Sequence, residues 1–260
     1  MKKLYIIALC AISALAANAQ QTLNLSTYSG TDLAKYNGQA LKVTVSRYVF
    51  NGWNTISLPI DVSAAELDAT FGSDSKLEKL VGVENDGNGV KLNFQDCKAE
   101  GIKANTPYIL YYTGEPGTKK FTVDEALVED SEAEISFTAE GTGETVKMAC
   151  ARKHTDATGL YGVLAKDNSE AKFVNVDGIT NGFYATRCYI KLSSGNSTQL
   201  TTNHIAAGDV SSISAIAAAG DMVDVYNISG VRVASGIKAS DVNRLQKGIY
   251  VVNGQKIMVK

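Results

Sequence analysis

The side chains that could carry out catalysis are few in this 260-residue sequence. Of the two histidines, His154 follows Cys150 by four residues, a combination that nucleophilic catalysis can use. The surrounding "RKHTDATG" is typical of a hydrated turn, and no third residue that would orient the histidine is evident. His204 also lies in polar surroundings, and neither histidine has a second His or Cys at the short spacing of a zinc site. We therefore predict no catalytic residues and no metal ligands.

Three other segments contain residue types that occur in active sites, but turns and loops explain them better. "ENDGNG" at residues 84–89 lacks the full spacing of a calcium-binding loop and indicates a hairpin turn. The acidic residues of 129–134 could supply glycosidase carboxylates, yet their composition favours a solvated loop. "GTGETVK" at 141–147 lacks the ending of a phosphate-binding loop, and no G-x-S-x-G occurs. We therefore expect a protein that is not an enzyme and has no cofactor.

The aromatic residues raise a second possibility, because exposed aromatic side chains on a β-sandwich can stack on sugars. Trp53 and the "YILYY" of residues 108–112 are the candidates. Trp53 stands between a turn and an apolar strand, where burial in the core is the usual position of a large aromatic side chain. "YILYY" has the composition of a strong strand. Burial is the favoured interpretation, and carbohydrate binding is kept as the alternative.

The first twenty residues, "MKKLYIIALCAISALAANAQ", have the three parts of a secretory signal peptide. Lys2 and Lys3 precede an apolar run that ends in an A-x-A site, so we expect cleavage after Ala19, which assigns residues 1–19 to the signal. The run is shorter than the roughly 20 residues that span a bilayer. Cys10 follows Leu9 rather than the small residue of a lipoprotein signal. We therefore predict an exported mature chain without a transmembrane segment.

Charge and cysteine content limit the partners and the covalent chemistry. The net charge is −2 and becomes more negative when the signal removes two lysines. Since no block of Lys or Arg forms a basic stripe, we expect no nucleic-acid partner. The remaining cysteines, Cys97, Cys150 and Cys188, are odd in number, so at most one intramolecular disulfide can form. All three pairings, and three buried free thiols, fit the sequence.

The patterning predicts strands throughout residues 20–205, with one short helix. "LKVTVSRYVF" at 41–50 alternates apolar and polar residues, and Pro59 should end the next strand or place it at a sheet edge. The exception is "SAAELDATFG", where Ser63 and Glu66 have capping-box spacing and Gly72 is placed to end a helix. The regular spacing of the strands indicates a sandwich or barrel. The predicted fold is all-β, with a β-sandwich-like main domain.

The composition of the sequence changes after residue 205. "AAGDVSSISAIAAAG" at 206–220 is small and almost uncharged, and we interpret it as a linker. Residues 221–260 contain about four strands, and Asn253-Gly254 predicts a two-residue hairpin turn between the last two. A small C-terminal β unit is therefore expected beyond the linker.

Two spaced patterns mark this C-terminal unit, "VYNISGVRV" at 225–233 and "LQKGIYVV" at 245–252. Together they resemble the C-terminal sorting domain of the type IX (Por) secretion system. Longer members of that family begin with a "YPNP"-like segment, which does not occur here after residue 206. The resemblance implies a role in secretion and surface sorting. The matching positions are Val225, Tyr226, Asn227, Gly230, Val233, Leu245, Gly248, Ile249 and Tyr250.

Three further segments, "GWNTISLPIDVS" at 52–63, "ANTPYILYY" at 104–112 and residues 159–192, are similar to a repeated β module of the same bacteria. The module occurs in their large exported surface proteins as "W-x-T-x-x-LPF-x-V" with "G-x-PYL", and it implies no catalytic residues. The sequence thus leads us to expect a non-catalytic secreted or cell-surface protein, structural or adhesive, exported through the periplasm of a Gram-negative bacterium. Its expected partners are the outer-membrane sorting machinery and surface glycans or proteins.

Overall fold

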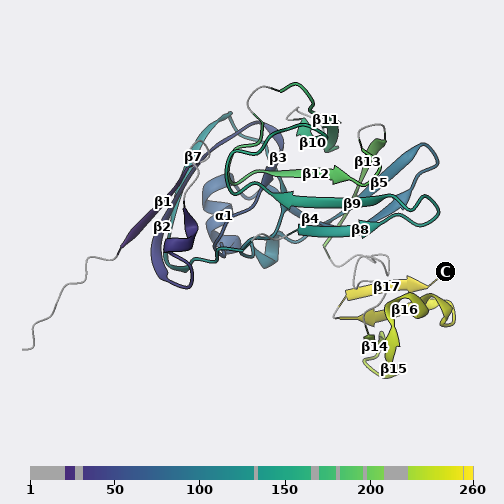
Figure 1. Ribbon diagram of the computed structural model, residues 1–260. Helices are drawn as coiled ribbons and strands as arrows, with labels where there is room; N and C mark the ends of the chain where they lie inside the picture. The colour runs from purple at the N-terminus through teal and green to yellow at the C-terminus, as the bar shows by residue number, and fades with distance from the viewer. Residues whose placement is uncertain are drawn as a thin grey trace, which may run out of the picture.

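The computed structural model describes residues 21–26, 32–131, 134–164, 170–179, 182–195, 198–207, 222–253 and 255–259. These residues form four sheets and one α-helix, which confirms the predicted all-β fold (Figure 1). The expected signal peptide and nearly all of the expected linker lie outside the described residues. Within the described part of the chain, no helix combines the length and the apolar character needed to cross a membrane.

Two five-stranded sheets form the main body. The central sheet consists, in order, of β13 (Gln199–Ile205), β5 (Gly89–Asp96), β4 (Lys76–Asn85), β6 (Tyr108–Tyr112) and β3 (Gly52–Ile56). The outer sheet consists, in order, of β11 (Lys172–Asn175), β10 (Leu160–Leu164), β12 (Cys188–Leu192), β9 (Thr145–Cys150) and β8 (Glu134–Thr138). Strand β3 ends before Pro59 and lies at an edge of its sheet, as predicted.

The core of the sandwich lies between these two sheets. Phe94 of β5 stacks on Phe173 of β11 with ring centroids 5.8 Å apart. Trp53 is only 1% exposed, which confirms its predicted burial. The other members of this core include Leu92, Ile109, Val146, Met148, Cys150, Cys188 and Ile190. Because inward-facing side chains of both sheets interdigitate, the main body is a β-sandwich.

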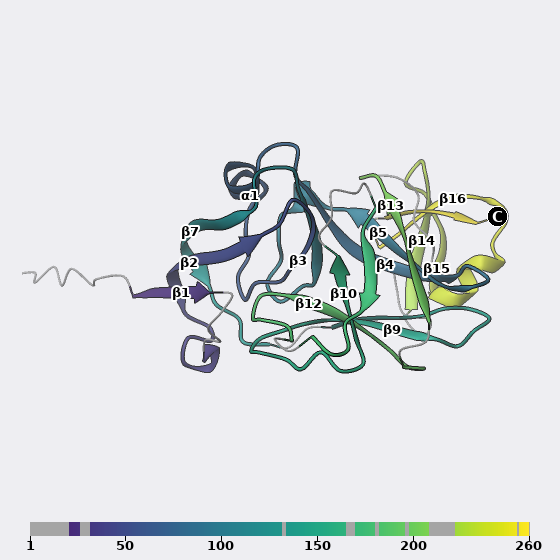
Figure 2. The ribbon, with the colours of Figure 1, turned by 90° about the horizontal axis from the view of Figure 1, so that it is seen from above.

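A third layer covers the other face of the central sheet. The N-terminal sheet consists of β1 (Thr22–Ser26), β2 (Ala40–Val49) and β7 (Gly117–Leu127), and α1 (Ala64–Phe71) lies beside it (Figure 2). Adjacent residues of β6 consequently face different cores, with Ile109 in the sandwich and Leu110 under the N-terminal layer. Covering both faces explains why β3 is buried at every position, whereas β2 alternates.

Helix α1 begins and ends as the sequence predicts. The Glu66 N–H donates to Ser63 Oγ at 3.3 Å, and the Ser63 N–H donates to Glu66 Oε2 at 2.8 Å, which completes a capping box. Gly72 follows the last turn with φ +89°, a value that favours glycine. Leu67 and Phe71 are buried in the N-terminal core, so packing rather than helical propensity holds this two-turn helix.

Two strands form parallel pairs that the sequence does not predict. β13 pairs with β5 in parallel, and β1 pairs with β2 in parallel. Both are partly exposed, and β13 pairs with a strand that is distant along the chain, whereas β1 pairs with the next strand. The alternation of apolar and polar residues within a strand does not identify its pairing partner, because the partner depends on how the sheets pack around the core. The predicted hairpin of β4 and β5 is confirmed, and "ENDGNG" forms its turn.

The C-terminal sheet has the order β15 (Arg232–Lys238), β14 (Met222–Asn227), β16 (Gly248–Val252) and β17 (Gln255–Val259). Val252 pairs with Gln255, which confirms the hairpin around Asn253. Its small core lies on one face, under the 3-10 helix Ala239–Arg244. The core residues are Val223, Val225, Ala239, Val242, Val252, Ile257 and Val259. No described residue belongs both to this core and to those of the main body.

Candidate functional site

The fold separates the cysteine and the histidine that could have formed a nucleophilic pair. His154 is exposed and lies edge-on to Tyr184, with ring centroids 5.8 Å apart. Cys150 is buried in the sandwich, where its thiol is 3.3 Å from the carbonyl oxygen of Asn105. Among the described residues, no group of three His, Cys, Asp or Glu side chains is arranged to hold a metal ion.

His204 has polar neighbours, as its sequence indicates, and an aromatic neighbour as well. Its ring stacks on Trp53, with centroids 4.8 Å apart. Its Nδ1 lies 2.6 Å from Oε2 of the buried Glu78, and the Ala171 N–H donates to Nε2 at 3.4 Å. Burial raises the pKa of Glu78 above its ordinary value, while the hydrogen bond with His204 acts in the opposite direction. Because both ring nitrogens of His204 have hydrogen-bond partners in the protein, this residue links β13 to β4 and is not available as a general base.

Arg47 is the most deeply buried charged residue of this region, with 1% exposure. Its Nη2 donates to the Thr55 carbonyl at 2.6 Å and its Nη1 to the Thr186 carbonyl at 3.1 Å. Burial, together with the nearby Arg187, lowers its pKa well below the ordinary value. Sequence reasoning missed this residue, although the alternation of β2 places Arg47 on the same face as Val45. It joins the N-terminal sheet, the central sheet and the segment before β12.

A concave, mostly apolar pocket of about 380 Å³ is the best candidate for a small-ligand site. This volume lies within the range of about 300–1,000 Å³ that ligand pockets have. Phe50, 44% exposed, stands at its rim and contacts Tyr48 edge-on at 5.0 Å between centroids. The Arg187 guanidinium lies 6.0 Å from the Phe50 ring centroid and donates to the Tyr48 carbonyl. An aromatic rim beside a cation suits a ligand with both a flat apolar face and polar groups.

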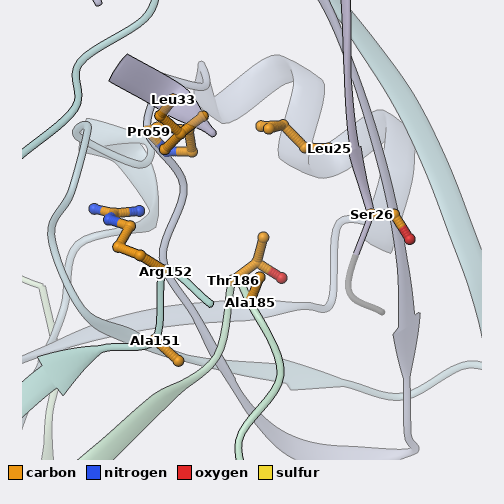
Figure 3. Close-up of a pocket in the computed structure, with 8 residues that line it drawn as sticks. All are labelled: Leu25, Ser26, Leu33, Pro59, Ala151, Arg152, Ala185 and Thr186. Atoms are coloured by element: carbon orange, nitrogen blue, oxygen red, sulfur yellow. The ribbon is translucent and has the colours of Figure 1, made fainter. Parts of the chain in front are cut away.

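A second cavity, between β1 and the segment before β12, is much smaller (Figure 3). Leu33 and Pro59 lie on one side of it, and Arg152 and Thr186 on another. Its volume is about 20 Å³, enough for one water molecule and too small for an organic ligand. Arg152 Nε and Thr186 Oγ1, atoms of two residues that line this cavity, are buried without a hydrogen-bond partner in the protein. This cavity therefore suits a structural water.

Several of the nine sorting positions form the turn and the core of the C-terminal sheet. Asn227 Oδ1 accepts hydrogen bonds from the N–H groups of Ser229 and Val231, and Gly230 has φ +78° in the same turn. Val225 is fully buried. The Tyr250 hydroxyl donates to the Gln246 carbonyl at 2.7 Å. Leu245 packs against the core, Tyr226 and Gly248 are half-buried, and Val233 and Ile249 are 45% and 41% exposed.

Exposed apolar side chains are concentrated on this sheet. Eight large hydrophobic residues are exposed in the described part of the chain, and five of them lie between residues 222 and 249. Since Tyr250 and Val252 face the core, the alternation of β16 directs Ile249 to the uncovered face. The five are Met222 of β14, Ile228 and Val231 of the turn after β14, Val233 of β15 and Ile249 of β16, and we refer to them together as the C-terminal apolar surface.

The alternative of an exposed aromatic platform at Trp53 and residues 108–112 is not what the structure has. Trp53, Tyr108 and Tyr112 are buried, and Tyr111 is half-buried against the sandwich core. The pocket at Phe50 was missed because its lining residues come from β2, β3, β10 and several residues between Val176 and β12, which are distant from one another in the sequence. No family model, no curated protein and no solved structure matches this chain.

Proposed function

We propose that this chain is a non-catalytic protein of the bacterial surface or exterior, and that outer-membrane sorting machinery binds its C-terminal sheet. The observation that carries this proposal is the C-terminal apolar surface. A monomeric protein normally exposes apolar side chains singly, and a group of them is typical of a recognition surface. Here the group lies on the unit whose sequence resembles a sorting domain.

The sheet also offers backbone groups for recognition. β15 and β17 are its edge strands. Edge strands present unpaired N–H and C=O groups to which another protein can add a strand. A partner that pairs with an edge and covers Ile249 would use main-chain bonds for affinity and apolar contacts for specificity. This is recognition of a folded surface, and it requires no chemistry from the chain itself.

The test compares surface display of three chains in the native host. Removing residues 221–260 should leave the protein in the periplasm. Ile249→Asp should lower the surface-labelled fraction by about tenfold or more, because an unpaired charge in an interface costs more than about 1.4 kcal/mol. Leu127→Asp is the matched control, since Leu127 is 51% exposed on β7 of the main body.

Thermal unfolding would separate a sorting defect from misfolding. Purified Ile249→Asp protein should unfold at the same temperature as the wild type, because the side chain lies outside the small core. The mass of the surface protein should also show whether the C-terminal unit is removed after transport. Normal display of the truncated chain would contradict the proposal.

The aromatic pocket supports carbohydrate binding as a second candidate function. Phe50 is exposed at the rim of this ligand-sized cavity, whereas Trp53 is inaccessible. A glycan array probed with the wild-type mature chain should show binding that Phe50→Ala reduces and Leu127→Ala leaves unchanged. An array without any bound glycan would remove this candidate.

A further inference from the structure

Two of the three cysteines lie directly opposite each other in the outer sheet. β9 and β12 are antiparallel, and Cys150 is the register partner of Cys188. Both side chains face the sandwich core. Cys97 is in the separate N-terminal core, where its thiol lies 3.5 Å from the Leu77 carbonyl oxygen. The fold therefore selects one of the three pairings that the sequence allows.

The register also has the spacing that a disulfide needs. The Ala151 N–H donates to the Arg187 carbonyl at 2.7 Å, so the ladder bond lies at the neighbouring pair. The Cys188 N–H donates instead to Thr55 Oγ1 at 2.9 Å. Cys150 and Cys188 are thus a non-hydrogen-bonded pair, whose Cα atoms lie about 4.5 Å apart in antiparallel sheets. Disulfides span Cα separations of about 4.4–6.8 Å.

We infer that Cys150 and Cys188 form a cross-strand disulfide in the exported protein, while Cys97 remains a free thiol. The bond would join the two segments on either side of the loop that contains β10 and β11. The inference rests on the proposed function only in one respect, because export supplies the oxidising compartment in which disulfides persist.

The bond forms in two thiol–disulfide exchange steps. The thiolate of one of the two cysteines attacks a disulfide of an oxidoreductase or of oxidised glutathione, and one thiolate of that oxidant leaves. The other cysteine then loses its proton and attacks the sulfur of the first, which expels the second thiolate. Two electrons and two protons pass to the oxidant.

The test uses the whole mature chain, refolded in buffer that contains reduced and oxidised glutathione. After denaturation without a reductant, N-ethylmaleimide labels every free thiol, and intact mass gives their number. We expect one label, on Cys97, and a proteolytic fragment in which Cys150 is linked to Cys188. Three labels, or a linkage that includes Cys97, would overturn the inference.

Two variants and a second source of protein sharpen this test. Cys97→Ser should keep the linkage and take up no label. Cys188→Ser should form no intramolecular disulfide, and a linkage between Cys97 and Cys150 in this variant would contradict the pairing that the fold selects. Protein recovered from the native host reports on export separately. If the bond forms on refolding but the cellular protein is reduced, the pairing is supported and export is contradicted.

Discussion

At the residue scale, the hydrogen bond between Glu78 and His204 shows how burial changes the role of a polar side chain. His204 lies on β13 at one edge of the central sheet, and its ring covers Trp53. The Glu78 side chain is 4% exposed, so its ionised form has lost most of its hydration. His204 restores part of that stabilisation through its Nδ1. If both side chains were exposed to water, the hydrogen bond between them would contribute little to the stability of the fold.

We predict that Glu78 makes the protein less stable as pH rises. Burial raises the pKa of Glu78 in the folded state above the ordinary value of 4.5. Its stabilising contribution is therefore complete below about pH 4.5 and is lost as pH rises through the folded-state pKa. Glu78→Gln cannot ionise, and urea unfolding of this variant should lose that part of the pH dependence. Glu84→Gln, on the exposed end of β4, is the control and should keep the wild-type slope.

At the element scale, the capping box of α1 accounts for the one helix in a chain of strands. Two turns are too few for an isolated helix in water, so the ends and the packed face must both contribute. Ser63 supplies the first hydrogen bond of the helix, and Phe71 packs edge-on against Tyr112 of β6. The helix in turn covers part of the face of the central sheet that does not belong to the sandwich.

Removing this cap should have a small and measurable cost. We expect Ser63→Ala to lower the free energy of unfolding by about 1 kcal/mol, within the usual range of about 0.5–2 kcal/mol for an N-cap. Ser73→Ala is the matched control, because Ser73 is exposed just beyond the helix. Urea denaturation of both variants measures the difference. Equal midpoints would show that the tertiary contacts of α1 alone fix the helix.

At the scale of the whole molecule, the main body and the C-terminal sheet have separate cores. The main body contains the single tryptophan of the sequence, Trp53. The fluorescence of Trp53 therefore follows unfolding of the sandwich without a contribution from the C-terminal sheet. This makes the independence of the two units directly measurable in the intact chain.

Val225→Asp should unfold the C-terminal sheet alone. A buried unpaired carboxylate is costly in a core as small as this one. We expect this sheet to become sensitive to protease, while the Trp53 transition keeps its wild-type midpoint. Val231→Asp is the control, because Val231 is 59% exposed in the turn. A lower Trp53 midpoint in Val225→Asp would show that the two units support each other.

A second prediction at this scale concerns the proposed disulfide. The bond between Cys150 and Cys188 would close a loop of about 39 residues, which restricts the unfolded chain and stabilises the fold by about 4 kcal/mol. Reduction should lower the urea midpoint of the Trp53 transition accordingly. Cys97→Ser should respond to the reductant in the same way. A midpoint that does not change with reductant would contradict this contribution.

The sequence by itself determined the local features of this protein. Alternation fixed β2, Asn253 and the "ENDGNG" turn fixed two hairpins, and Ser63 with Glu66 fixed the start of α1. These features depend on backbone preferences and on contacts between residues near one another in the chain, so their signals are present in short windows.

Only the tertiary structure decided which distant residues meet. In the folded chain β13 pairs with β5, the His204 ring stacks on Trp53, and Phe50 lies beside Arg187 at one pocket. It also placed Cys150 opposite Cys188 and left Cys97 in another core. The physical reason is that burial and register are properties of packed layers. A short stretch of sequence shows that a residue can be buried, while the neighbours against which it is buried come from the folding of the whole chain.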